Sequence, residues 1–190
     1  MIKQAAVLGL AGALAISSGV AQAAADDKMF SVGGALYWID VEATNIGEME
    51  FSGGALVGTA AFNENVAVRG SIYNTKWDDD SALKLSGYDT QLLLGSNLKS
   101  EGFKFYAAIG VFSESMTVSG VRGDLDFNGG QFGVGLGYNW PSVSLDYSIN
   151  VRSADDYADF VEQSGLMQLA GVTRSEVSAV SSSLALAVRF

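Results

Sequence analysis

The sequence contains no cysteine, no histidine and only one proline. Without cysteine the protein forms no disulfide bond and offers no thiolate ligand to a metal ion. Positive charge is also scarce: 11 lysines and arginines stand against 21 aspartates and glutamates, which gives a net charge of −10. Such a chain has no basic surface to release counterions from a polyanion, so the charge argues against a nucleic-acid partner.

Long hydrophobic runs are missing from most of the chain. No stretch of about 18 apolar residues follows Ala24, so the sequence predicts no membrane-spanning helix there. Nevertheless, 48% of the residues are apolar and 11% are aromatic, which is too much for a disordered chain. A length of 190 residues suits one domain with a real core. The composition therefore favours a single folded domain made largely of strands.

The N-terminus has the arrangement of a cleavable signal peptide. Lys3 precedes an apolar segment, which is followed by small residues and by Ala21-Gln22-Ala23, a motif that signal peptidase accepts. We expect residues 1–23 to be removed on export, with a cut after Ala25 as the alternative, and residues 24–190 to form the mature domain. An N-terminal membrane anchor is the competing interpretation, but the apolar segment is short for a spanning helix.

The rest of the chain alternates between apolar and polar residues. In residues 143–152 each odd position is apolar and each even position is polar, and residues 131–140 alternate in the same way between large apolar residues and glycine or amide residues. Successive side chains of a strand point to opposite faces. Each segment is therefore predicted to be a strand with one apolar face and one polar or small face.

Eight such strands are expected, joined by links of alternating length. A soluble sandwich would alternate too, but three features favour a membrane barrel: strands long enough to cross, apolar faces without charge, and small residues on the polar faces. The predicted fold is an all-β, eight-stranded antiparallel transmembrane β-barrel, an up-and-down meander with its short turns in the periplasm. The expected strands are residues 29–42, 48–62, 66–77, 88–98, 103–115, 124–140, 143–153 and 176–190.

The C-terminal segment Ser-Leu-Ala-Leu-Ala-Val-Arg-Phe, which ends at Phe190, resembles the last strand of small bacterial outer-membrane barrels. With the strand pattern, the mature chain is similar to the OmpA-, OmpX- and OmpW-like superfamily. The resemblance implies a bacterial outer-membrane location and partners among outer-membrane lipids and lipopolysaccharide. It also implies that Leu186, Val188 and Phe190 form an assembly signal read by the barrel-assembly machinery.

Charges of both signs occur on the polar faces. A small barrel fills its interior with side chains, and opposite charges there would pair rather than remain isolated. We interpret these charges as part of a polar structural core that fills the interior. The alternative is a thin water-filled path lined by the same charges. The residues are Arg69, Asp89, Lys104, Asp146, Arg152 and Arg189.

The absence of histidine limits the chemistry. The known outer-membrane acyltransferases, deacylases, phospholipase and proteases rely on a histidine, so the resemblance gives no catalytic residues here. We expect no enzyme activity and no cofactor. The expected function is a structural or surface-interaction role in the envelope, and the alternative is a narrow porin-like channel for ions or small amphiphiles.

The predicted loops suggest two places for function. Acidic residues such as Glu42, Glu48 and Glu50 form either a solvated rim or a Ca²⁺ or Mg²⁺ site that bridges lipopolysaccharide phosphates. The last loop, residues 154–175, carries apolar residues that either cover the barrel mouth or offer a patch to a partner or to lipid. The candidate residues in this loop are Tyr157, Phe160, Val161 and Leu166.

The facing of some strands stays open. Each of the pairs Gly33-Gly34 and Gly53-Gly54 could host a bulge that exchanges the two faces, and Gly129-Gly130 marks a similar break. Outward aromatic residues are expected in two interfacial girdles. The girdle near the outer ends comprises Trp38, Trp77 and Tyr88, and the periplasmic girdle comprises Phe62, Phe103, Phe105, Tyr138, Trp140 and Phe190.

Overall fold

The structure is a computed structural model that describes residues 28–43, 47–78, 83–118, 124–163 and 177–190. The predicted signal peptide and its cleavage sites lie outside the described residues.

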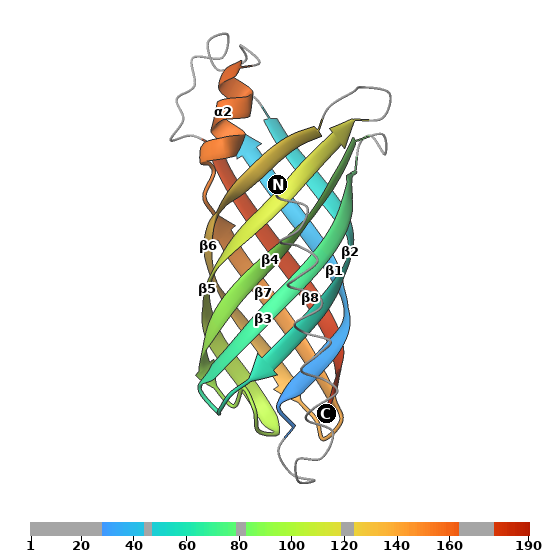
Figure 1. Cartoon of the computed structure of the whole chain (residues 1–190), viewed down its shortest axis with the longest axis vertical. Coiled ribbons are helices and arrows are strands. Elements are labelled where there is room, and N and C mark those ends of the chain that lie inside the picture. Colours follow the sequence, from blue (N-terminus) through green and yellow to red (C-terminus); the bar gives the residue numbers. More distant parts are fainter. Residues whose placement is uncertain (1–27, 44–46, 79–82, 119–123, 164–176) are drawn as a thin grey trace, which may run out of the picture.

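Eight strands in sequence order form a closed antiparallel barrel, which confirms the predicted fold (Figure 1). A nine-residue helix, α2 (Asp155–Gln163), precedes the last strand. No helix in the described part of the chain is long and apolar enough to cross a membrane. The strands are β1 (Phe30–Ala43), β2 (Gly47–Ala61), β3 (Val66–Trp77), β4 (Leu83–Ser96), β5 (Gly102–Val118), β6 (Asp124–Asn139), β7 (Val143–Arg152) and β8 (Val177–Arg189).

The two ends of the barrel differ in their links. We call the end with the short links 62–65, 97–101 and 140–142 the turn end, and the opposite end, where α2 lies, the loop end. The barrel closes at the turn end through reciprocal backbone hydrogen bonds of 3.0 and 2.9 Å between Phe30 and Phe190. The chain therefore enters and leaves the barrel at the same end, as an even number of strands requires.

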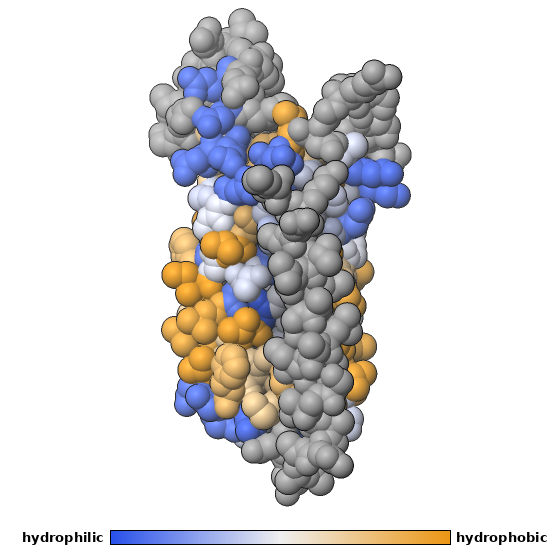
Figure 2. All heavy atoms as spheres, in the orientation of Figure 1, coloured by the Kyte–Doolittle hydropathy of each residue, from blue (hydrophilic) through white to orange (hydrophobic). Residues whose placement is uncertain are grey.

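The outward face carries an apolar band. Phe132 and Val134 of β6 are each 64% exposed, and all of the other strands contribute large apolar residues to the same band. Figure 2 shows hydrophobic residues over the middle of the visible face, with hydrophilic residues at both ends. In β5 the band runs from Phe103 to Val111, about 26 Å along the strand and about 20 Å along an axis tilted by about 40°. That height approaches the roughly 25 Å apolar band of an outer-membrane barrel.

The register of the described strands runs without a bulge at the glycine pairs. Gly33 and Gly34 pair with Val57 and Leu56 of β2 in unbroken sequence, and the register of β6 is equally continuous through Gly129-Gly130. The expectation that these pairs could exchange the two faces was wrong. Glycine serves close packing instead: a Cβ at Gly33 would collide with the backbone of β8.

The two faces exchange polarity along most of the strands, although the register is continuous. In β6, Gln131 points into the barrel and Phe132 outward, whereas nearer the loop end Phe127 is buried inside and Asn128 points outward. Above the membrane the outward face meets water and the inside becomes an ordinary apolar core. Phe127 is therefore out of phase with Phe132 because its surroundings change, and not because the strand is bulged.

The same exchange explains two further differences from the sequence-based expectation. Trp77 does not belong to the outer aromatic girdle, because it points inward and packs against the buried apolar cluster. β4 begins at Leu83, five residues before the predicted start at residue 88. At the start of β4, Leu85 points into the barrel, and Lys84 and Ser86 point outward. This is the reverse of the pattern expected within a membrane.

Candidate functional site

The interior of the barrel contains all six charged residues identified in the sequence. Each is buried, with exposed fractions of 3–6%. The structure places five of them in two ion-pair networks and the sixth, Arg189, at the turn end. The interior is therefore the most strongly charged buried region described.

The first network is centred on Asp146 of β7 and lies toward the turn end. The carboxylate of Asp146 accepts ion pairs from Arg69 Nη1 at 3.0 Å and from Lys104 Nζ at 2.6 Å. The hydroxyl of Tyr106 donates to the same carboxylate and accepts a 2.7 Å hydrogen bond from Arg69. Lys104 also donates to Ser144 at 2.8 Å. The Asp146 network thus links β3, β5 and β7 across the interior.

Glycine provides space for this network. The ring of Tyr106 lies where a Cβ of Gly135 would be, and the Lys104 chain lies 2.8 Å from a Cβ built on Gly137. Any larger side chain at either position would displace a member of the network. The glycines of β6 therefore make room for the charged side chains, as crowding in a narrow barrel requires.

The second network is centred on Arg152 and lies toward the loop end. Its guanidinium donates to Glu114 at 2.8 Å and lies 4.0 Å from Asp89. Tyr37 accepts from Arg152 at 2.7 Å and donates to Asp89 at 2.7 Å. Tyr73 donates to Glu114 at 2.6 Å. The Arg152 network therefore holds two carboxylates, one cation and two phenols.

Aromatic rings enclose the guanidinium of Arg152. The rings of Tyr37 and Tyr73 are stacked, with centroids 4.5 Å apart, and the guanidinium carbon lies 4.6 Å from the centroid of Phe112. A guanidinium is weakly hydrated and stacks well on aromatic faces, so arginine suits this position better than lysine.

Sequence reasoning missed Glu114 and the three tyrosines that connect the charges. Glu114 has the same parity as Lys104 in β5 and is therefore on the inward face, but its neighbours on that face, Phe112 and Met116, are apolar. An inward position between two apolar residues is not where the sequence pattern predicts a carboxylate such as Glu114. Parity alone would have found Tyr73 and Tyr106, which lie an even number of residues from Arg69 and Lys104.

The turn end is closed by side chains that bind the turns. Arg189 donates to the carbonyl of Trp140 at 2.7 Å and to the carbonyl of Lys99. Asn139 donates to the carbonyls of Asn97 and Ser100, each at 3.0 Å. Arg189 therefore acts separately from the two networks, as a clamp between two turns.

The loop end is filled by an apolar cluster that includes α2. Tyr157 and Ala158 of the helix are 3% and 2% exposed. The ring of Tyr157 stacks on Phe127 with a centroid distance of 4.6 Å. Asp156 fixes the helix by accepting the backbone N–H of Asn128 at 2.7 Å. The helix therefore packs into the barrel mouth through its first turn.

The other predicted residues of this loop are not all described. Phe160 and Val161 belong to α2, but their side chains lie outside the described part of the structure, as does Leu166 altogether. Tyr157 is consequently the one member of the predicted group whose side chain can be placed.

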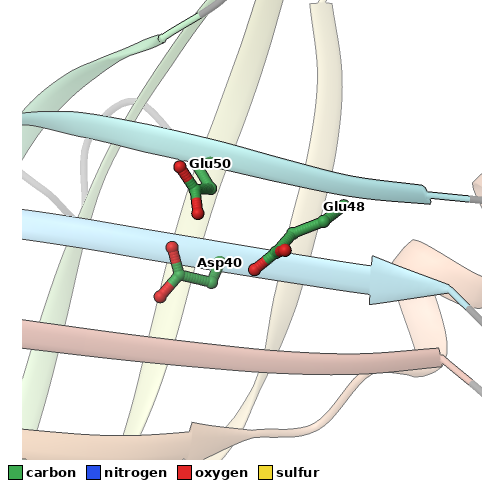
Figure 3. A group of neighbouring side chains, drawn as sticks. All are labelled: Asp40, Glu48 and Glu50. Atoms are coloured by element: carbon green, nitrogen blue, oxygen red, sulfur yellow. The ribbon is translucent and has the colours of Figure 1, made fainter.

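A group of carboxylates lies on the outward face near the loop end (Figure 3). Asp40 of β1 and Glu48 and Glu50 of β2 have carboxylate oxygens within 4.8 Å of one another. The sequence had singled out the two glutamates and Glu42, but not Asp40. Solvated carboxylates on a rim can adopt the same arrangement, so the group alone assigns no ligand.

The strand order and the apolar band are those of an outer-membrane barrel, and a comparison with known protein families gives the same result. The profile of the outer membrane protein beta-barrel domain matches residues 8–190. The chain belongs to this outer-membrane β-barrel family. No curated protein sequence matches the chain.

Solved structures share the fold of this outer-membrane barrel. Ail, the attachment invasion locus protein of Yersinia pestis, is 17% identical with a TM-score of 0.55, covering 87% of this chain and 99% of Ail. Neisserial surface protein A is 15% identical with a TM-score of 0.57, covering 85% of this chain and 97% of its own. At these identities the likeness shows the fold alone.

The residues that resemble an assembly signal occupy the outward face of this barrel. Leu186, Val188 and Phe190 are 59%, 60% and 52% exposed and continue the apolar band to the turn end. They are accessible from the membrane side of β8.

Proposed function

We propose that this outer-membrane barrel is a non-enzymatic envelope protein whose interior is a structural core and whose loop end is its working surface. One observation carries the proposal: two ion-pair networks and an apolar cluster occupy successive levels of the interior. Charges that satisfy one another across a narrow barrel form a packed core and not an open passage. The absence of histidine from the chain supports a non-enzymatic role.

The proposal includes an orientation and a route of biogenesis. The signal peptide is cleaved, the barrel-assembly machinery reads the outward face of β8, and the turn end lies in the periplasm. Lipopolysaccharide and other lipids surround the apolar band. Replacement of Phe190 by alanine should reduce the amount of heat-modifiable protein in outer-membrane fractions, and an unchanged amount would remove Phe190 from the assembly signal.

A narrow channel is the second candidate, and one observation favours it. Several buried polar atoms of the interior have no partner among the described protein atoms, including both side-chain polar atoms of Gln131 and Ser181 Oγ. Such groups are commonly satisfied by internal water, which would provide the start of a conducting path.

Conductance separates the two candidates. The refolded protein in planar bilayers should show no unitary steps, and neither should the variant Tyr157→Ala, because the Arg152 and Asp146 networks remain beneath the mouth. Stable unitary steps in the wild-type protein would overturn the closed core. Steps in the variant alone would show that α2, and not the networks, closes the barrel.

A further inference from the structure

β6 extends farther toward the loop end than its neighbour β7. Residues Gln131 to Asn139 of β6 pair with β7, whereas no described strand pairs with residues 124–130 on that side. Where β7 ends, the chain continues into α2, which lies beside the loop-end part of β6 (Figure 1). The segment that leads from β7 into α2 therefore takes the place of a strand along this edge of β6.

Two hydrogen bonds hold this segment on the edge of β6. The backbone N–H of Ser153 donates to the carbonyl of Gly130 at 2.8 Å. Two residues farther along the edge, the N–H of Asn128 donates to the carboxylate of Asp156 at 2.7 Å. The first bond continues the ladder between β6 and β7, and in the second a side chain satisfies a backbone donor that a strand would otherwise pair. α2 is thus attached to β6 through its first turn.

Gly129 provides the space that this attachment needs. A Cβ at Gly129 would overlap Ser153 Oγ and lie 3.0 and 3.2 Å from two ring carbons of Phe112. At Gly130, the nearest atom to a Cβ is the backbone oxygen of Gly110 at 3.9 Å, which is an ordinary contact. The two neighbouring glycines therefore differ, because Gly129 forms the seat of the α2 segment and Gly130 has room for a side chain.

Phe112 connects this seat to the Arg152 network. Its ring is stacked with that of Tyr157, with centroids 6.4 Å apart, and its centroid lies 4.6 Å from the guanidinium carbon of Arg152. The two tyrosines of the network belong to the same packed cluster as Tyr157. Arg152 is also the residue that precedes Ser153 in the chain. A change at the network therefore reaches α2 through a packed ring and through the backbone.

Two features limit the stability of the docked helix. The hydroxyl of Tyr157 is buried and has no hydrogen-bond partner among the described residues. An unpaired buried hydroxyl costs free energy that release of the helix would recover. A helix of nine residues is also too short to persist in water without packing. Release would therefore unfold α2 and not displace it as a rigid body.

From these contacts we infer that α2 is a reversible lid on the barrel mouth, and that the Arg152 network sets the fraction of molecules in which the lid is docked. With the network intact, the guanidinium packs on Phe112 and Phe112 packs on Tyr157. Loss of the network frees Phe112 and releases the lid. Because coupling between two sites is reciprocal, a partner that captures the released segment at the loop end would also weaken the network. The inference does not depend on whether the interior conducts.

A single spin label measures the docked fraction. The chain has no cysteine, so Asp155→Cys, at an exposed position in the first turn of α2, carries a nitroxide at one site only. In the refolded protein in lipid vesicles, the docked lid gives an immobile component of the spectrum and the released segment gives a mobile one. Gly129→Ala should raise the ratio of mobile to immobile label about tenfold, because an added methyl group overpacks the seat.

Gly130→Ala is the matched control for the seat, and its ratio should stay within about twofold of that of the parent labelled protein. G129A/S153A removes the overlapping hydroxyl and should reverse most of the increase. Equal ratios for Gly129→Ala and Gly130→Ala would overturn the seat. A double variant as mobile as Gly129→Ala would overturn it too.

Two further variants test the coupling, and heat-modifiable migration verifies that each protein is folded. Arg152→Met should raise the ratio of mobile to immobile label about fivefold or more. Asp146→Asn, which weakens the network that does not contact Phe112, should leave the ratio within about twofold of that of the parent. A ratio for Arg152→Met no higher than that for Asp146→Asn would overturn the coupling between the network and the lid.

Discussion

The turn-end and loop-end halves of the barrel are built from the same strands but have opposite polarity on their inward and outward faces. In the turn-end half, Asp146 and its cations lie inside and aromatic and aliphatic residues face outward. In the loop-end half, Phe127 and Leu85 lie inside, and Asn128 and Lys84 face outward. The backbone is continuous through both halves, so the surrounding medium decides which face is apolar. Whether a residue's number in the strand is odd or even determines the face on which its side chain lies. The polarity of that side chain instead reflects the medium that the face meets.

The Arg152 network lies where the two halves meet, and its loss should have the largest effect. Arg152→Met leaves the carboxylates of Glu114 and Asp89 buried without their cation, which should destabilise the barrel by about 3–5 kcal/mol. Urea unfolding in lipid vesicles, followed by tryptophan fluorescence, measures this loss.

The double variant R152M/E114Q provides the control. Removal of one carboxylate with the cation should recover part of the lost stability. If Arg152→Met were as stable as the wild type, the Arg152 network would not hold the two halves of the barrel together.

In the turn-end half, Asp146→Asn should have the next largest effect. The amide keeps one acceptor for Tyr106 or Lys104 but leaves two buried cations uncompensated, so we expect a loss of about 2–4 kcal/mol. Asp126→Asn, on the exposed outward face of β6, is the matched control and should change the unfolding free energy by less than about 0.5 kcal/mol. Equal effects would show that the turn-end interior is hydrated and not packed.

At the loop-end mouth, Tyr157→Ala should have a smaller effect. It removes the stacking on Phe127 and part of the apolar cluster, and a loss of about 1–3 kcal/mol is expected because the helix can partly re-pack. Proteolysis within the last loop should become faster, whereas Tyr157→Phe should behave as the wild type. A cleavage rate unchanged in Tyr157→Ala would show that Tyr157 does not hold α2 in the mouth.

The smallest effect is expected on the outer rim. Glu50→Gln should stabilise the barrel by a few tenths of a kcal/mol in the absence of divalent cations, because it relieves repulsion with Asp40 and Glu48. Thermal unfolding with and without millimolar Ca²⁺ measures the change. If Ca²⁺ stabilised the wild type and not the variant, these carboxylates would hold the ion; equal curves would leave a solvated rim.

Much of the fold and part of the site could be predicted from residue order. The alternation in residues 143–152 required a two-sided strand, and parity in β3, β5 and β7 placed Arg69, Lys104 and Asp146 inside. Parity could not reveal which charges meet. Asp146 contacts Arg69 and Lys104 across the interior, and that pairing depends on the closure of the barrel.

The failures of the sequence analysis have one physical cause. Trp77, Phe127, Glu114 and the start of β4 were misread or overlooked because the apolar face was assumed to be the outward one along the full strand length. That assumption holds only where lipid surrounds the barrel. The sequence by itself determined the strands, their order and their parity, because a two-residue period is a local property of the chain. Only the tertiary structure decided where the polarity reverses and which charges pair, because these depend on register and on closure around a common interior.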